Sequence, residues 1–560
     1  MNLPMNDLQS QAAFVAQSAW RLLSQIDMDP VSPTRGCAHL AYWRDKTSDV
    51  ADARRQEAML PLALLYTRDY PGSAWRGDQR VRDAAEALLG YWCRAQYPDG
   101  SLDEWYKGER AFAAVAFTTY AVARTIQIME GHLSPKVLGR ARNALDRSAC
   151  WLTTRNDLFK TNHQAVGVGA LAFAGHVLDR PAFIKDAKRK IGSIVSAQTS
   201  EGWFPEVGRM DVGYTFLTVE YVTMAMDIWN DFSQLEPFSR AYDFACRFVH
   251  PDLTLGEEYG VCRNPYISRI ATIMLSRSNP LAAGLRRRFE TASTGEAGLR
   301  PTLADDLRLP RWSFQPLTAL DYASRITPLP PESADELPLA APAAGLRTFP
   351  LAGQAFLSAG GKAVIASASA GGLVRFFGHG GAELTEYGYC LTENIPATSV
   401  GYRPGAIPVA DGSGVVMESV ISPVRKFMPS FLARVALRLA CSTALGSRLA
   451  RKGIDFIRRR KGTALNQSSP SLAGNSKWRL KRTLEMRDGL LVLTDKLTFG
   501  APVDSALLHV LRGENNDPMR LEPLASLVPG LPASLAEFVL VRTFDPGGTW
   551  RLVETGLSIG

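Results

Sequence analysis

The chain has 560 residues, of which 46% are hydrophobic and 21% are charged, and its formal net charge is +8. This length suits two or three domains, and the apolar content excludes disorder along the whole chain, because enough apolar surface is available to offset chain entropy. The positive charge is concentrated. Residues 425–461 hold eleven Lys and Arg against one acid and so carry +10, which leaves −2 for the remaining chain.

The first twenty residues, MNLPMNDLQSQAAFVAQSAW, have no basic residue and no continuous apolar run, so no signal peptide is predicted. No stretch reaches the roughly 18 uncharged apolar residues of a spanning helix. The seven cysteines are scattered without a C-x-x-C pair, which argues against a disulfide framework or a zinc site and fits a reducing compartment. We therefore expect a cytoplasmic protein, peripheral to the inner membrane, that binds no metal.

Residues 1–325 have the periodicity of helices. In 78–95, apolar residues recur at i, i+3, i+4 and i+7, which predicts an amphipathic helix. Similar patterns predict helices at 109–128, 137–153, 163–178, 182–198, 213–229, 235–249 and 264–276.

A weak repeat runs through this helical region. QYPDGSLDEW (96–105) and QTSEGWFPEV (198–207) each precede a helix, and RNDLFKTNHQ (155–164) enters one midway between them. A helix–loop–helix unit of about 50 residues must bury its apolar faces against neighbouring units. The pattern therefore predicts an (α/α) solenoid curled into an incomplete toroid, with the recurring loops along one surface.

The period changes after a proline-rich linker at 326–350. Residues 351–560 contain short, β-rich runs separated by turns, which predict an antiparallel β-sandwich. Arg487-Asp488-Gly489 supplies a hairpin turn between two alternating runs. Residues 425–465 have helical periodicity instead and are predicted to be an insertion. The fold class is thus an α+β multidomain chain.

Three segments concentrate polar residues. At 161–164, Asn162 fits a helix cap, but capping leaves the adjacent His163 unexplained. The loop at 202–214 holds aromatic and charged residues that suit a sugar, although Trp203 can also plug a helix end and Asp211 can cap the next helix. In the β-rich half, His379 follows an apolar strand among glycines. The residues singled out in the loop are Trp203, Glu206, Arg209, Asp211 and Tyr214.

Taken together, these segments resemble the heparinase II/III-like polysaccharide lyases, which include alginate and heparan lyases. In that family an Asn-His pair opens a toroid helix and a Tyr follows some fifty residues later, as Asn162-His163 and Tyr214 do here. A sandwich motif near H-x-H-x-D matches 379–383, where the first His is His379, the second is replaced by Gly381 and the acid is Glu383.

The resemblance implies cleavage of a uronic-acid-containing polysaccharide by β-elimination, without a cofactor. Asn162 and His163 would bind the uronate carboxylate, so that the intermediate formed by loss of the C5 proton is tolerated. Tyr214 would act as the general acid and as a candidate base, and His379 would be the other candidate base. Arg209 and Trp203 would position the sugar, and Glu206, Asp211 and Glu383 complete the predicted substrate-binding set.

Two alternatives stay open. A helical toroid can carry a glycoside hydrolase with two carboxylates, for which Asp103, Glu104, Glu206 and Asp211 are candidates. The chain can also be a non-catalytic glycan-binding component of polysaccharide assembly, since Gly381 departs from the family motif.

The basic insertion suggests a second partner. Apolar residues interleaved with arginines over 425–461 suit a helix lying on an anionic membrane, and no nucleic-acid-binding motif accompanies them. We therefore expect peripheral membrane contact and no nucleic acid. The alternative is that this segment packs on the toroid with its arginines in solvent or facing an acidic polymer.

Overall fold

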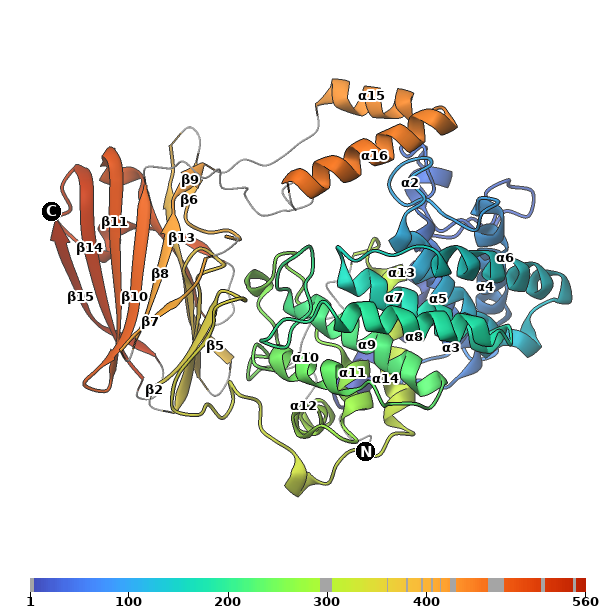
Figure 1. Ribbon diagram of the computed structural model, residues 1–560, viewed down its shortest axis with the longest axis horizontal. Coiled ribbons are helices and arrows are strands. Elements are labelled where there is room, and N and C mark those ends of the chain that lie inside the picture. The colour runs from blue at the N-terminus through green and yellow to red at the C-terminus, as the bar shows by residue number, and fades with distance from the viewer. Residues whose placement is uncertain are drawn as a thin grey trace.

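A computed structural model describes residues 5–292, 305–359, 361–378, 381–393, 396–403, 406–412, 414–423, 430–461, 478–514, 519–546 and 550–559. Figure 1 shows two parts side by side: helices up to α14 form one, and two antiparallel sheets form the other. A pair of helices, α15 and α16, lies over the helical part.

The helical part has inner and outer helices with different sequences. The inner helices α5, α7 and α9 are apolar nearly all round and almost fully buried, whereas α4, α6, α8 and α10 bury a single stripe. Inner helices contact one another in the order α3–α5–α7–α9–α11–α14, and α14 also contacts α3. The bounds are α1 (Asp7–Leu23), α2 (Leu40–Trp43), α3 (Met59–Thr67), α4 (Gln79–Ala95), α5 (Phe112–Met129), α6 (Pro135–Thr153), α7 (Thr161–Val177), α8 (Pro181–Val195), α9 (Val212–Ile228), α10 (Glu236–Cys246), α11 (Arg269–Leu275), α12 (Pro280–Thr291), α13 (Leu309–Trp312) and α14 (Phe314–Ala323).

The repeat seen in the sequence is also a repeat in structure. The backbone N–H of Tyr97 donates to the carbonyl of Ser101 at 2.9 Å, and that of Thr199 donates to Trp203 at 3.0 Å. Gly100 and Gly202 both have positive φ, 88° and 102°, in these loops. A Cβ at Gly100 would lie 2.3 Å from the carbonyl oxygen of Arg147, so the close approach of loop to helix requires glycine there.

Two antiparallel sheets form the sandwich. One has the order β1-β2-β3-β4-β5-β12-β13, with β6 pairing β5 and β9, and the other has the order β15-β14-β11-β10-β8-β7. The strands of the first sheet are β1 (Gly345–Phe349), β2 (Gln354–Ala359), β3 (Lys362–Ser367), β4 (Leu373–Gly378), β5 (Gly381–Leu391), β6 (Ala397–Thr398), β9 (Ser422–Pro423), β12 (Leu508–Glu514) and β13 (Arg520–Pro523). Those of the second are β7 (Val409–Asp411), β8 (Gly414–Val420), β10 (Arg479–Arg487), β11 (Leu490–Asp504), β14 (Ser534–Asp545) and β15 (Arg551–Ile559), and a short helix α17 (Leu524–Leu527) follows β13.

Two local predictions can be compared with these strands. Strands β10 and β11 pair as a hairpin through Asp488 and Gly489, whose φ values are 51° and 79°, which confirms the predicted turn. Strand β1 begins at Gly345, inside the range predicted as linker. Its residues pair with β2, and this pairing rather than local composition decides their conformation.

The first sheet is buried on both faces. Along β3, Val364 and Ala366 pack between the two sheets, while Ala363 and Ile365 belong to the same apolar cluster as the helices. Strands β3 and β4 are therefore buried at every residue instead of alternately. The predicted fold class, a helical toroid followed by an antiparallel β-sandwich, is confirmed.

The joint between the two parts is polar as well as apolar. The Arg375 guanidinium on β4 donates to the Tyr259 hydroxyl at 3.3 Å and forms an ion pair with Glu258, also at 3.3 Å. The backbone N–H of Ala352 donates to Glu201 at 2.9 Å. These contacts place the first sheet against the loops that follow α8 and α10.

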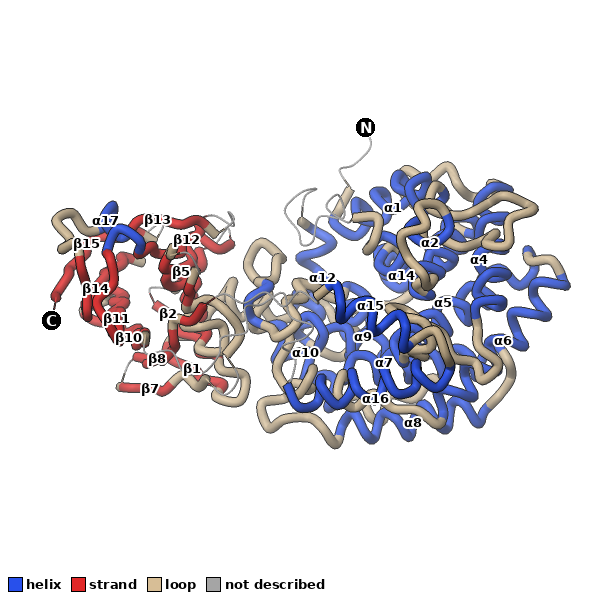
Figure 2. The backbone as a smooth tube through the Cα atoms, turned by 90° about the horizontal axis from the view of Figure 1, so that it is seen from above, coloured by secondary structure: helices blue, strands red, loops and turns tan. Residues whose placement is uncertain are grey.

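The helices of the predicted insertion are α15 (Phe431–Ala440) and α16 (Ala444–Lys461). Seen from above in Figure 2, both lie across the helical domain and apart from the sheets. Within the described residues, one helical stretch, Phe112–His132, is long and apolar enough to cross a membrane, and 83% of that window is buried inside the protein. It includes α5, so its apolar character is that of an inner helix of the toroid.

Candidate active site

A pocket of about 340 Å³ opens where several inner helices begin. The first residues of α7, α9 and α11 line it, together with residues of α1, the short 3₁₀ helix η1 (Ala53–Ala58) and the segment 307–316. Helix N-termini carry unpaired N–H groups and partial positive charge, so this end of the toroid favours an anion.

Asn162 and His163 both line this pocket, as their position at the start of α7 predicted. The Asn162 side chain is only 1% exposed, and within the described residues neither its Nδ2 nor its Oδ1 has a hydrogen-bond partner. A buried amide without a partner costs free energy. A pocket ligand that bonds to this amide would offset that cost.

His163 is oriented by a carboxylate that the sequence analysis did not single out. Its Nδ1 lies 2.9 Å from Oδ2 of Asp157. Burial alone would raise the pKa of Asp157, but the hydrogen bond and charge of His163 bring it below its ordinary value, so this carboxylate is ionised and accepts the Nδ1 proton. Burial lowers the pKa of His163 despite Asp157. The ring is therefore neutral near pH 7, with the lone pair on Nε2.

Tyr214 is the third residue of α9 and lines the same pocket. Burial raises the pKa of its hydroxyl well above the ordinary value, and the nearby Cys262, Glu206 and Asp211 act in the same direction. Arg54 opposes them without reversing the shift. Tyr214 thus keeps its proton at neutral pH, as a general acid must.

Five arginines line the pocket, whereas no Asp or Glu is among its lining residues in the described part of the chain. Carboxylates lie behind them: Arg54 pairs with Glu57 at 2.7 Å, and Arg311 pairs with Asp52 at 2.8 Å. Nε of Arg311 and Nη2 of Arg269 are buried and have no hydrogen-bond partner among the described residues. The five are Arg54, Arg263, Arg269, Arg308 and Arg311.

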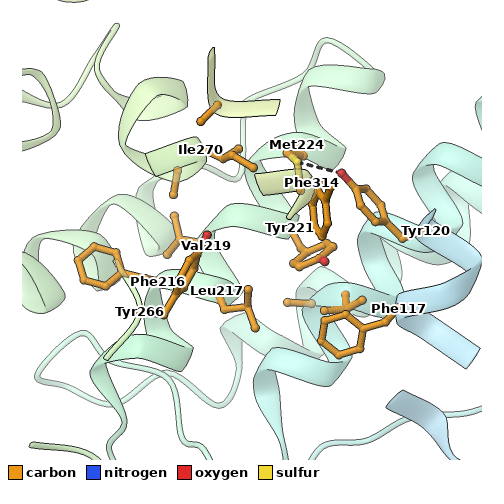
Figure 3. Packing of buried hydrophobic residues seen from close by; sticks show 14 of the residues in the cluster. Phe117, Tyr120, Phe216, Leu217, Val219, Tyr221, Met224, Tyr266, Ile270 and Phe314 are labelled. Atoms are coloured by element: carbon orange, nitrogen blue, oxygen red, sulfur yellow. Dashed lines mark hydrogen bonds between the residues drawn. The ribbon is translucent and has the colours of Figure 1, made fainter. Parts of the chain in front are cut away.

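Aromatic side chains that line the pocket belong to the packed core, part of which Figure 3 shows. Phe117 and Tyr221 line the pocket and pack edge to face, with ring centroids 5.8 Å apart. Tyr221 packs in turn on Tyr120, whose hydroxyl donates to the Met224 sulfur at 3.4 Å. The Arg54 guanidinium lies over the Phe117 ring, 3.6 Å from its centroid, which fixes one cation at the wall.

Glu206 and Asp211 do not line the pocket, although both were predicted to bind substrate. Asp211 caps α9: its carboxylate accepts the backbone N–H of Tyr214 at 3.0 Å and of Cys262 at 2.8 Å. Glu206 is bridged through its backbone to Lys160 and Arg209. Burial raises the pKa of Glu206 to about 8 and that of Asp211 to about 6. The Glu206 carboxyl group accepts the backbone N–H of Asn162 at 3.4 Å and so ties the loop to α7, whereas Asp211 positions Tyr214.

Trp203 and Arg209 also lie outside the pocket lining. Trp203 is 4% exposed within the apolar core and donates its indole N–H to Glu201 at 3.0 Å, so its ring has no open face for a sugar and its predicted role is corrected. Arg209 extends toward the sandwich, with its guanidinium 5.3 Å from the centroid of the Tyr402 ring. Burial raises the pKa of Tyr402 to about 12.

The carboxylates of the hydrolase alternative are used by the fold itself. Asp103 accepts the backbone N–H of Gly108 at 2.7 Å and of Arg110 at 2.8 Å, and Glu104 pairs with Arg311 at 3.2 Å. None of these carboxylates, nor Glu206 or Asp211, lines the pocket. The paired acids that hydrolysis requires are therefore not presented there.

The sandwich motif is only partly described. His379 lies outside the described residues. Glu383 accepts the backbone N–H of Trp550 at 2.7 Å and pairs with Lys362 at 3.5 Å, so this carboxylate serves the sandwich instead of a substrate, which corrects its predicted role. Gly381 has φ 127°, and a Cβ there would lie 2.9 Å from Oδ2 of Asp252. The positive φ at 381 strains any residue with a Cβ, so the backbone there disfavours a histidine.

Comparison with known proteins agrees with this architecture. Residues 37–206 match the family model of the ulvan lyase N-terminal domain. The chondroitin AC lyase of Streptomyces coelicolor A3, solved with chondroitin sulphate, has a TM-score of 0.53 and 13% identity over 92% of this chain and 71% of that one. Heparinase III has a TM-score of 0.50 and 12% identity over 92% of this chain and 74% of that one. No curated protein sequence matches this chain.

These matches confirm the resemblance predicted from the sequence: the chain is similar to the heparinase-like polysaccharide lyases, and it has their fold of helical toroid and β-sandwich.

Sequence reasoning missed several residues of the pocket. Asp157 could have been predicted as a partner of His163, since it precedes His163 by six residues in the polar segment RNDLFKTNHQ. Arg54 and Arg311 could not have been predicted, because they come from segments 257 residues apart and meet only in the folded toroid.

Proposed function

We propose that the protein is a polysaccharide lyase that cleaves a uronic-acid-containing polysaccharide by β-elimination. The observation that carries this proposal is the meeting of Asn162, His163 and Tyr214 in one pocket walled by arginines. A cationic pocket fits an anionic polymer, and the absence of Asp and Glu from its described lining favours elimination over acid-pair hydrolysis.

The Asn162 amide, which has no hydrogen-bond partner among the described residues, would donate to the uronate carboxylate. The wall of arginines would neutralise that carboxylate, which makes the C5 proton more acidic. Nε2 of His163 would take that proton, and ionised Asp157 would stabilise the imidazolium that forms. The electron pair released at C5 forms the C4–C5 double bond as the bond from C4 to the glycosidic oxygen breaks. Tyr214 would give its proton to the leaving oxygen and recover one from His163 through solvent. From the sequence, His163 was predicted to bind the carboxylate, and Tyr214 and His379 were the candidate bases. His379 lies outside the described residues, so its role stays a prediction.

The test is a screen of purified protein against uronate-containing polymers, with near-ultraviolet absorbance and product mass as readouts. Elimination gives an unsaturated sugar that absorbs, and its product lacks the added water that hydrolysis leaves. We expect Tyr214→Phe to lower the rate by about 10²- to 10⁴-fold, since it removes only the acid's hydroxyl. Tyr97→Phe, which loses a hydroxyl bound to Asp103 outside the pocket, is the matched control.

Three outcomes oppose the proposal. Saturated products indicate a hydrolase, and full activity in Tyr214→Phe removes this tyrosine from the chemistry. Tight binding of a uronate polymer without turnover by the wild type supports the non-catalytic glycan-binding alternative.

A further inference from the structure

Helices α15 and α16 expose large apolar side chains to solvent. None of the residues of α15 is buried. The exposed fractions of six of their Phe and Leu residues run from 59% to 77%, although a folded protein usually keeps such side chains inside. These six are Phe431, Leu432, Leu439, Leu445, Leu449 and Phe456.

The apolar residues fall on helical stripes edged by cations. On α16, Leu445, Leu449 and Phe456 are spaced i, i+4 and i+11, so they share one face, and Lys452 lies on the same side. On α15, Phe431, Val435 and Leu439 share a face, and Arg434 and Arg438 lie at its edge. The side chains of Arg434, Arg438, Arg448 and Lys452 are all exposed. We call the six apolar residues and these four cations the hairpin surface.

The hairpin is seated on the helical domain by its other side. Ser447 is buried, and its hydroxyl donates to the carbonyl of Lys107 at 3.1 Å. Gly108, next in the chain, is so close that a Cβ there would lie 2.5 Å from the Cβ of Ser447. Arg438, one of the four cations of the hairpin surface, also reaches the helical domain and pairs with Asp49 at 3.3 Å. Figure 1 shows both helices beside α2, away from the sheets, so neither sheet covers the hairpin surface.

We infer that the hairpin surface docks the protein on a lipid bilayer that contains anionic lipids. A stripe of Phe and Leu bordered by Lys and Arg is suited to lie in the interfacial plane, where the apolar side chains enter the acyl boundary and the cations meet lipid phosphates. An exposed tryptophan, Trp105, lies on the loop that seats the hairpin and is 67% exposed, and tryptophan is enriched at such interfaces.

Other occupants fit less well. An acidic polysaccharide or a nucleic acid would be bound by the arginines, but it offers nothing to the exposed Phe and Leu. A second copy of the chain would place two hairpin surfaces of the same charge against each other. The inference does not depend on the proposed lyase activity, because the surface is distinct from the pocket.

The experiment is co-sedimentation of the full-length protein with neutral phosphatidylcholine vesicles and with vesicles that also contain phosphatidylglycerol, at low and high salt. We expect binding to the anionic vesicles alone, weakened by salt. The triple variant Leu445→Gln/Leu449→Gln/Phe456→Gln tests the stripe, and Arg434→Gln/Arg448→Gln/Lys452→Gln tests the cations. Each is expected to weaken binding about tenfold or more.

Matched controls change exposed residues elsewhere on the protein. Val31→Gln/Leu521→Gln/Val553→Gln removes three exposed apolar side chains, and Lys136→Gln/Arg479→Gln/Lys481→Gln removes three exposed cations. Both are expected to bind like the wild type, and an unchanged melting temperature shows that each variant is folded. The inference is overturned if the wild type binds neither kind of vesicle, or if the control variants lose binding as much as the hairpin variants. The inference is also overturned if the hairpin binds DNA or an acidic polymer but no vesicles, or if it drives self-association of the chain without vesicle binding.

Discussion

The Asp157 carboxylate lies 2.9 Å from Nδ1 of His163 at the start of α7. This contact decides which nitrogen of the ring is free, because an ionised carboxylate only accepts hydrogen bonds and so holds the ring proton on Nδ1. It gives the pocket a neutral imidazole whose Nε2 can take a proton.

Asp157→Asn tests this relationship through the pH profile of kcat/KM. Asp157 raises the pKa of His163 against the larger, opposite effect of burial, so removing its charge lowers that pKa further. We expect the acidic limb of the profile to move to lower pH and the rate at its plateau to fall at least about tenfold, since the imidazolium loses its stabilising charge. Asp227→Asn, at a surface pair with Arg325, is the control that keeps the wild-type profile. An acidic limb that stays in place would separate Asp157 from the protonation of His163.

Asn162→Ala is expected to remove activity while leaving the free energy of unfolding within about 1 kcal/mol of the wild type or above it, because the buried amide has no hydrogen-bond partner to lose among the described residues. Gln164, two residues on, provides the contrast. Its side chain accepts the backbone N–H of Asp157 at 3.1 Å and donates to Asn156 at 2.8 Å, so Gln164→Ala should cost about 1–3 kcal/mol. Chemical denaturation measures both. If Asn162→Ala destabilises as much as Gln164→Ala, the Asn162 amide is a structural group.

Glu206 and Asp211 are expected to contribute a stabilisation that is lost as pH rises from about 5 to 8. Burial raises the folded-state pKa of Glu206 to about 8 and of Asp211 to about 6, so the folded protein holds protons that the unfolded chain releases at lower pH. The stabilisation is complete below the ordinary pKa of a carboxyl group and is lost as pH rises through these raised values. Glu206→Gln, which keeps the shape without the charge, should flatten the dependence and raise the melting temperature at pH 8. Thermal melts at pH 5, 6.5 and 8 measure this, with Glu554→Gln as an exposed control. A variant that keeps the wild-type slope would show that Glu206 is not the group responsible.

The chain by itself determined the two-part architecture and the core of the candidate site. The switch from helical to strand periodicity predicts the toroid and the sandwich, since the periods 3.6 and 2 follow from local backbone geometry. Asn162, His163 and Tyr214 could be identified because helix N-termini are marked by short polar segments, and such ends of neighbouring inner helices meet in a toroid. The hairpin turn at Asp488 and Gly489 is equally local.

Tertiary structure decided which polar residues face the pocket. Trp203, Glu206 and Asp211 have the composition of a sugar site, yet packing and backbone hydrogen bonds use all three within the fold. Arg54 and Arg311 meet at one wall from opposite ends of the helical domain, and no local pattern encodes a contact between residues so far apart in sequence. The concentrated charge at 425–461 is plain in the sequence. The pocket is also cationic, although the chain outside 425–461 is near neutral. The reason is that the fold turns the arginines of its ion pairs toward the pocket and leaves their carboxylates behind.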